Sequence, residues 1–239
     1  QLVGMTLDGD FVCNVNYRRD TGLRQSYSDP DTNKMIMPFP VKMMNARVRR
    51  DMTILENGFD LVHHPTGMTR ADFFNDDLVK ARYYPLCEDS IKSVTGAAAV
   101  RCFHHAVRGH AGMPFAGIAH CDYSTYTSHK LVQGAGGVPE GIKMPFKGRM
   151  CVLNLWRNIN DASPIQNHHL AMCDGSSIVS PDDFVHYENL DDATGETSIS
   201  FHMSPNNHHM HKWYYYPLMT ADEVIVFMQY DSDPCRRCR

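Results

Sequence analysis

Apolar and polar residues alternate along several short runs of this chain, and this pattern predicts a mainly β fold. Clusters of Gly, Pro, Asn and Asp separate most of the runs, as is typical of turns. Few helical patterns lie between the runs, which favours an antiparallel jelly roll over a parallel α/β sheet. The runs expected to form strands are FVCNVNY (11–17), NGFDLVHH (57–64), AVRCFHHAV (99–107), FAGIAHCDYST (115–125), RMCVLNLWRNI (149–159), HHLAMCDGSS (168–177), SISFHMS (198–204), KWYYYP (212–217) and EVIVFMQY (223–230).

Residues 71–96 show a different pattern, because their apolar residues recur at roughly helical spacing. Asp72 lies near the start of this segment and Gly96 follows its end, which matches the signals that begin and stop a helix. From the length of 239 residues we expect a single domain over residues 1–239. In it, a helix-containing N-terminal part, about residues 1–99, buttresses a jelly-roll core at 100–239 of the cupin-like, double-stranded β-helix type.

Charge and composition narrow the range of partners. The chain has 23 Lys and Arg against 27 Asp and Glu, so it lacks the basic balance that binding to nucleic acid or an acidic membrane requires. No apolar run approaches the roughly 20 residues that cross a bilayer. The first residues lack a basic segment followed by an apolar one, so we expect a cytoplasmic protein with reduced cysteines. A small molecule is the expected partner, and a homodimer is compatible with these features.

Ligand-type side chains gather at His120-Cys121-Asp122, within a chain that holds 14 His. Residues at positions i and i+2 of a strand project from the same face, so His120 and Asp122 are placed to share one metal ion. Two His and one carboxylate form the facial set that binds iron(II) with open positions. The alternative is a strand-end His followed by a turn-capping Asp. A lone CxxC at Cys235 and Cys238 is interpreted as a loose tail and not as a zinc site.

The third ligand is expected in NNHHMHKWYYYP, which offers His208, His209 and His211. We choose His211, because it directly precedes an aromatic strand and is the best held of the three. His120, Asp122 and His211 then form the predicted metal and catalytic centre. The alternative for all three histidines is a turn that faces solvent.

Arg157 is the first candidate for holding a carboxylate inside the barrel, because a planar guanidinium grips a carboxylate through two hydrogen bonds. It shares a strand face with Leu153 and Leu155. The alternative is a structural ion pair with Asp161 or Asp174. Arg101 is the second candidate for the co-substrate, together with Arg108.

The candidate substrate contacts are Tyr123, His105 and Trp213, since binding pockets are mostly apolar and aromatic with few polar anchors. His104 and His105 straddle a strand, so one of them is expected to face the barrel interior. Core packing is the alternative for all of these side chains.

Three stretches of the chain carry a resemblance: GAAAVRCFHHAVR (96–108), LNLWRNINDASPIQNHHLAMCDGSSI (153–178) and HKWYYYPLMTADEVIVFMQYDSD (211–233). They resemble the fungal non-haem iron oxygenases of secondary metabolism, the hydroxylase/desaturase group that includes gibberellin desaturases and proteins related to a cephamycin methoxylase component. The match runs from about Asn57 to Asp233. It implies a double-stranded β-helix, iron(II) at His120 and Asp122, 2-oxoglutarate as co-substrate, and molecular oxygen. A small natural product would be hydroxylated, desaturated or cyclised.

The chain also departs from this family. Family members continue past the YDS block into a His-containing strand and an Arg-x-Ser strand whose Arg holds 2-oxoglutarate, whereas this sequence ends at DPCRRCR. The usual Lys of that block is Met228 here. Three interpretations stay open: the sequence stops short of those strands, His211 and another cation replace them, or iron chemistry is lost.

Two competing hypotheses follow from the departure. The first is a redox-neutral isomerase, dehydratase or cyclase that uses His and Asp as acid and base. The second is a silent binding subunit, which would bind neither metal nor co-substrate. The oxygenase is preferred, because acid and base chemistry does not require two chelating residues on one strand face.

Overall fold

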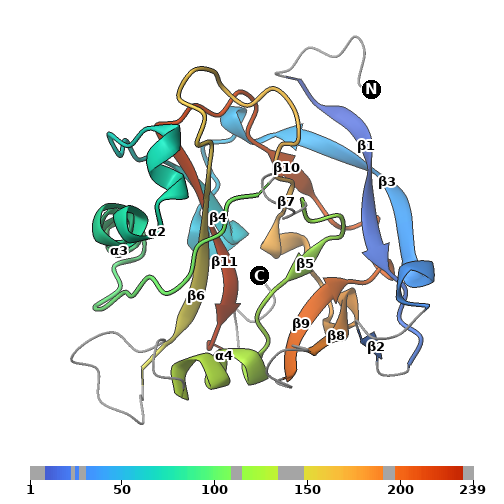
Figure 1. The fold of residues 1–239 in the computed structure, drawn as a ribbon. Coiled ribbons are helices and arrows are strands. Elements are labelled where there is room, and N and C mark those ends of the chain that lie inside the picture. Colours follow the sequence, from blue (N-terminus) through green and yellow to red (C-terminus); the bar gives the residue numbers. More distant parts are fainter. Residues whose placement is uncertain are drawn as a thin grey trace.

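Three β-sheets form the framework of the computed structural model, which describes residues 9–22, 25–26, 31–108, 115–133, 148–190 and 197–233 (Figure 1). The prediction of a mainly β protein with flanking helices is confirmed. Cys235 and Cys238 lie outside the described residues. No helix in the described part of the chain is long and apolar enough to span a membrane.

Strands from both ends of the chain pair within the same sheets. The first sheet has the order β1 (Phe11–Arg18), β3 (Ile36–Asn45), β10 (Trp213–Tyr215), β7 (Met172–Cys173). The second has the order β4 (Phe59–His63), β11 (Glu223–Asp231), β6 (Cys151–Arg157). The third has the order β2 (Gln25–Ser26), β8 (Phe184–Leu190), β9 (Thr197–Met203), β5 (His120–Cys121). The N-terminal part thus supplies strands to the sheets in addition to the helices expected there; the single-domain extent stays a prediction.

The predicted helical segment is confirmed. It comprises a 3-10 turn (Arg70–Phe74), α2 (Asp76–Leu78), a π turn (Val79–Tyr83) and α3 (Tyr84–Thr95). Pro85 cannot donate a main-chain hydrogen bond, which accounts for the break in regular α geometry just before it. Gly96 ends α3 in the left-handed conformation, with φ of 70°, and donates its N–H to Lys92 O. Figure 1 shows α2 and α3 beside the β4–β11–β6 sheet, where Ile91 packs on Val224 and Val226.

Three expected strands are largely irregular, and in one of them, the run 168–177, only Met172 and Cys173 form a strand, β7. Residues 99–107 form no strand, and in the run 115–125 only His120 and Cys121 pair, before α4 (Thr125–Gln133) begins. The Ser124 hydroxyl accepts the Thr127 N–H and so helps to start this helix. The remaining short elements are 3-10 turns at Thr32–Met35, Ala46–Val48, Gly175–Ser177 and Pro181–Asp183, and α1 (Ile54–Asn57).

The sequence pattern missed β3 and β8. Strand β3 contains Pro38 and Pro40, and prolines argue against a central strand because they lack an N–H. The register resolves this conflict: β1 pairs with the whole of Ile36–Met43, whereas β10 pairs with β3 only at Met43–Asn45. Both prolines therefore lie where β3 has one neighbouring strand.

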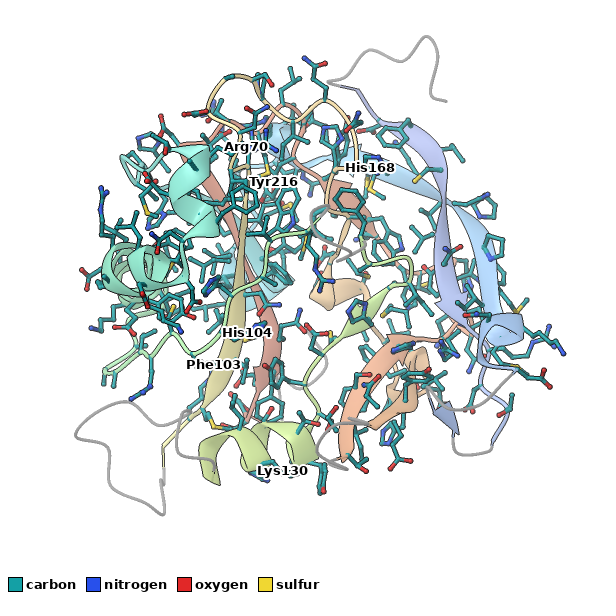
Figure 2. The ribbon with its side chains drawn as sticks, in the orientation of Figure 1. Arg70, Phe103, His104, Lys130, His168 and Tyr216 are labelled. Carbon is teal, nitrogen blue, oxygen red and sulfur yellow. The ribbon has the colours of Figure 1, made fainter. Side chains whose placement is uncertain are left out.

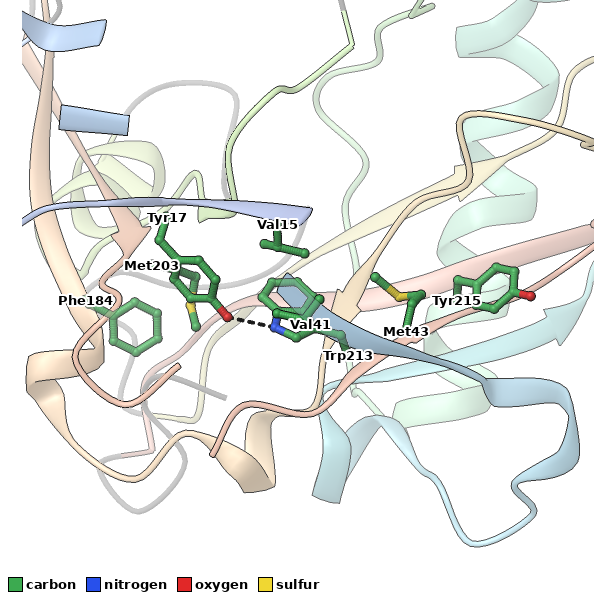
Figure 3. Close-up of a cluster of buried hydrophobic side chains, with 8 residues drawn as sticks. All are labelled: Val15, Tyr17, Val41, Met43, Phe184, Met203, Trp213 and Tyr215. Carbon is green, nitrogen blue, oxygen red and sulfur yellow. Dashed lines mark hydrogen bonds between the residues drawn. The ribbon is translucent and has the colours of Figure 1, made fainter. Parts of the chain in front are cut away.

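The first and third sheets meet in a cluster of buried side chains, drawn in Figure 3. Tyr17 is fully buried in it, and its hydroxyl accepts the Trp213 indole N–H at 2.8 Å. Burial of so many large apolar side chains supplies the main driving force that holds the two sheets together. The members are Val15, Tyr17, Val41, Met43, Phe184, Met203, Trp213 and Tyr215.

A bidentate ion pair closes the start of β11 against the turn that follows β3. Arg47 donates to both carboxylate oxygens of Glu223, at 2.7 and 2.8 Å, and also to Pro217 O. Burial alone would raise the pKa of Glu223, but the Arg47 and Thr220 hydrogen bonds outweigh it, so the pKa lies below the ordinary 4.5.

We predict that Glu223→Gln lowers the free energy of unfolding at pH 7 by about 1–3 kcal/mol, because a charge-assisted bidentate pair is lost. A carboxylate whose pKa is depressed by folding stabilises the protein above its unfolded pKa and ceases to do so as the pH falls through the folded pKa. The gap between wild type and variant should therefore shrink below pH 4.5. Urea unfolding from pH 7 to pH 3 measures it.

The matched control is Lys34→Gln, which removes the exposed pair with Asp31. It should change the free energy of unfolding by less than about 0.5 kcal/mol. An equal loss in both variants, or a Glu223→Gln loss that does not depend on pH, would contradict the prediction.

Candidate functional site

The candidate site lies at β5, the two-residue strand that carries His120. His120 pairs with His202 of β9 across the antiparallel ladder, and Cys121 pairs with Phe201. Asp122 follows directly after the strand, and its Oδ1 lies 3.2 Å from His120 Nε2. The structure thus brings the two residues of the predicted chelating pair together.

The proton on the His120 ring is fixed by the main chain. His120 Nδ1 lies 2.8 Å from Ile118 O, and because a carbonyl oxygen only accepts, Nδ1 carries the proton. The neutral ring then presents the lone pair of Nε2 on the side of the Asp122 carboxylate. Metal-binding histidines commonly hold the second ring N–H on a backbone carbonyl in this way.

Without a cation, His120 and Asp122 form an ion pair. Burial opposes the charged form of His120, but the hydrogen bond to Asp122 outweighs it and raises the His120 pKa. Burial likewise opposes the Asp122 carboxylate, yet His120, Arg108 and the side chain of Asn154 lower its pKa.

His202, the direct partner of His120, holds the opposite tautomer. Arg18 Nε donates to His202 Nδ1 at 2.8 Å, so Nδ1 is unprotonated and the neutral ring carries its proton on Nε2. The two imidazole rings lie 5.8 Å apart between centroids. Burial first, and then the cation on Arg18, lower the pKa of His202 to about 3. His202 therefore stands beside the pair as a neutral N–H donor and not as a ligand through Nε2.

His211, the predicted third ligand, is engaged elsewhere. Its Nδ1 lies 3.2 Å from the Tyr17 hydroxyl, and its Nε2 lies 3.5 Å from Asp183 Oδ1. The Tyr17 oxygen accepts the Trp213 N–H, and the Tyr17 hydroxyl donates to His211 Nδ1. The neutral His211 ring therefore carries its proton on Nε2, which faces Asp183. Among the contacts of the described residues, none joins His211 to His120 or Asp122.

The donor set therefore fits a metal ion in part. His120 and Asp122 supply two of the donors that iron(II) prefers, with the correct tautomer. Within the described ranges, no group of three or more His, Cys, Asp or Glu side chains is arranged to hold a metal ion. The ligand set that includes His211 stays a prediction.

Arg157 lies on the other side of β6 from the pair. Asn154 of the same strand contacts Asp122, and residues three apart in a strand face opposite ways. Arg157 Nη2 donates to His64 O at 2.6 Å, and its guanidinium lies 5.1 Å from the centre of the Tyr83 ring. The alternative ion pair with Asp161 or Asp174 is not formed. The co-substrate role of Arg157 stays a prediction.

The candidates Arg101 and His105 lie on the segment between α3 and β5, on which Figure 2 labels Phe103 and His104. Arg101 of this segment is exposed. His105 is held against the helices: the Tyr84 hydroxyl lies 2.9 Å from its Nδ1, and Asp76 lies near its Nε2. Roles for Arg101 and His105 stay predictions.

Tyr123 and Trp213 differ in their surroundings. Tyr123 directly follows Asp122 in the sequence and packs edge-on against Phe103, with 6.3 Å between ring centroids. Trp213 is 3% exposed and belongs to the core cluster with Tyr17. This placement agrees with core packing, the alternative for Trp213, and its substrate role stays a prediction.

Four residues that complete the site were not among the candidates. His202 lies beside His120 and accepts a hydrogen bond from Arg18, whereas Asn154 and Gln229 contact Asp122. Arg18 is 2% exposed and Gln229 is 8% exposed. For His202, Asn154 and Gln229 the sequence did contain a signal, because each is a polar residue within an apolar strand run. Polar side chains that are buried in this way have hydrogen-bond partners in most proteins.

Comparison of the sequence with known proteins identifies the family of this chain. The family profile described as "Oxidoreductase/YMDC permease-like domain" matches residues 9–239. The chain belongs to this oxidoreductase family. The profile covers β5 together with the strands β9, β6 and β11 that surround the His120–Asp122 pair.

Three curated relatives of this chain are fungal enzymes. The alpha-ketoglutarate-dependent dioxygenase tstK of Talaromyces stipitatus is 27% identical over 89% of this chain and 81% of its own length. The alpha-ketoglutarate-dependent dioxygenase phiK of a fungal species is 28% identical over 87% and 78%. The hydroxylase/desaturase efuI of Hormonema carpetanum is 27% identical over 79% and 70%. The resemblance to the fungal hydroxylase/desaturase group is confirmed.

A solved structure shares the fold. The iron and alpha-ketoglutarate-dependent endoperoxidase NvfI superimposes with a TM-score of 0.76 at 23% identity, over 97% of this chain and 88% of that chain. The same protein in a different conformation gives a TM-score of 0.72 at 23% identity. The three-sheet arrangement described above is therefore the fold of a known oxygenase.

We predict that Arg18→Met raises the pKa of His202 above 3, because it removes a buried cation and the donor that fixes the tautomer. The pKa should stay below the ordinary 6.5, since the ring remains buried. A pH titration of ¹⁵N-labelled histidines by NMR measures both the pKa and the tautomer, with His202→Phe used to assign the signal.

Arg19→Met is the matched control, because Arg19 is exposed and adjacent in sequence. It should leave the His202 signal unchanged. A wild-type His202 that titrates near 6.5, or that carries its proton on Nδ1, would contradict the hydrogen-bond assignment.

Proposed function

We propose that this chain is a non-haem iron(II)- and 2-oxoglutarate-dependent oxygenase that oxidises a small natural product in fungal secondary metabolism. The observation that carries the proposal is the His120–Asp122 pair, in which the Nε2 lone pair and a carboxylate converge at 3.2 Å. The named activities of the fungal relatives and of the structural neighbour support it. We also propose that the sheets form the double-stranded β-helix, or jelly roll, of those enzymes.

His120 Nε2 and the Asp122 carboxylate would hold the iron ion. Bound iron(II) with 2-oxoglutarate would supply the activation of molecular oxygen for attack on a C–H bond. His211 would serve as the third ligand only if its ring left Tyr17 and Asp183. The protein would keep His120 Nε2 and the Asp122 carboxylate facing each other and would place the substrate beside them.

The co-substrate carboxylate would require a cation, for which Arg157 and Arg101 are the proposed residues. Arg157 has a buried Nε without a hydrogen-bond partner and no carboxylate partner among the described residues, so its guanidinium keeps capacity for an anion. It would have to reach round β6 from the face that carries His64. Tyr123, with Phe103 at its edge, would form an apolar wall for the substrate.

A redox-neutral isomerase, dehydratase or cyclase is the second candidate. The raised pKa of His120 favours it, because an imidazolium paired with a carboxylate is a ready general acid. That reaction would need neither iron nor oxygen.

We predict that the wild-type chain binds about one iron(II) and shows the weak visible band of an iron–2-oxoglutarate chelate in an anaerobic titration. His120→Ala should lose iron binding and the band together, because it removes the nitrogen donor with the correct tautomer. His63→Ala, at an exposed position at the end of β4, is the matched control and should keep both.

The two candidate functions give opposite results under anaerobic conditions. Product that forms without oxygen and with a chelator present would reject the oxygenase and support the redox-neutral enzyme. Turnover that is retained in His120→Ala without bound iron would also reject the oxygenase.

A further inference from the structure

Strand β5 is a weak support for a site. It is the edge strand of the third sheet and pairs with β9 through only two residues, with one further main-chain hydrogen bond to β9 on each side, from Met203 N–H to Ala119 O and from Ser124 N–H to Ile199 O. Asp122 lies just beyond the last paired residue, so its N–H has no place in the ladder. A short edge ladder of this kind frays easily unless other contacts hold it.

The Asp122 N–H is instead held from another sheet. It donates to Gln229 Oε1 at 2.7 Å, and Gln229 belongs to β11 in the second sheet. Since a backbone N–H only donates, the amide oxygen of Gln229 is the acceptor. Asn154, on the neighbouring strand β6, also bonds the side chain of Asp122. Both the main chain and the carboxylate of Asp122 are thus held by the β6–β11 pair.

A β-bulge in β11 directs the Gln229 side chain toward Asp122. In the pairing of β11 with β6, Met228 is opposite Leu153 and Tyr230 is opposite Val152, so Gln229 is the extra residue without a partner. Met228, Gln229 and Tyr230 are all buried, so the Gln229 side chain lies inside the protein and not in solvent. Bulges bend a strand and re-aim a side chain, often beside a functional site.

We propose that Gln229 is a positioning residue: its amide oxygen, aimed by the bulge in β11, fixes the main chain of Asp122 so that the carboxylate stays opposed to His120. The inference rests on the proposed function, because the spacing that it protects is the one that would hold iron(II). Gln229 itself touches neither the ion nor the substrate.

A series of substitutions at Gln229 separates the effect of the acceptor oxygen from the effect of side-chain size. Gln229→Met has a similar length and no acceptor oxygen, whereas Gln229→Glu keeps an oxygen acceptor in the same place. Gln229→Ala also removes the acceptor and replaces the methionine variant if that chain does not fold. Asn158→Leu is the control for general destabilisation, because Asn158 is 8% exposed and bonds Ser163 O and Met219 O away from Asp122.

The first readout is hydrogen exchange of the Asp122 amide in the full chain without added metal. Gln229→Met should speed this exchange about tenfold, as the loss of one buried hydrogen bond implies. Gln229→Glu should stay within about threefold of wild type, and so should Asn158→Leu. Equal exchange in wild type and Gln229→Met would overturn the proposal.

The second readout is iron(II) affinity, measured anaerobically by calorimetry. Gln229→Met should bind iron(II) about 10–100-fold more weakly, the usual cost of losing a residue that orients a ligand, and Gln229→Glu should recover part of the loss. If wild type binds no iron, the proposed function fails, and the exchange experiment still decides whether Gln229 holds Asp122. Faster exchange with unchanged iron affinity would overturn the positioning role.

Discussion

The site depends on how a two-residue strand is held. Strand β5 has one neighbour in its own sheet, β9, and its ladder ends at Cys121. Beyond that point Ser124 donates its N–H to Ile199 O of β9, but the N–H and the carboxylate of Asp122 itself are held from the opposite sheet, by Gln229 and Asn154. The distance between His120 and Asp122 is therefore a property of two sheets packed together and not of the local HxD spacing alone.

The tautomer of each histidine near the site is set by a hydrogen-bond partner that can only donate or only accept. A carbonyl oxygen puts the proton of His120 on Nδ1, and an arginine N–H keeps the proton of His202 on Nε2. For His211, the indole of Trp213 acts through the Tyr17 hydroxyl to the same effect as the arginine. Of these three rings in the neutral form, only that of His120 directs an Nε2 lone pair toward a carboxylate, that of Asp122. Histidine count alone is a poor guide to metal binding, because the tautomer depends on neighbours distant in sequence.

The sequence predicted the features that depend on local pattern. Strands β6, β9 and β11 follow apolar runs, and the helix that ends at Gly96 carries its own stop signal. The pairing of His120 with His202 depends on which strands become neighbours, which periodicity does not encode. Arg157 shows the same limit: alternation correctly separated it from Asn154, but only packing decides which face of β6 meets Asp122. The helix α4 was missed because hydroxyl residues at its start also favour turns.

The prolines of β3 affect more than strand prediction. Along Ile36–Lys42, β3 has β1 on one side and no other strand of the described chain on the other. An open edge of main-chain donors and acceptors invites the strand of a second molecule to add to it. Pro38 and Pro40 remove two of those donors at alternate positions, so an incoming strand would meet an incomplete ladder. The same residues that make β3 hard to recognise in the sequence protect this sheet from edge-to-edge aggregation.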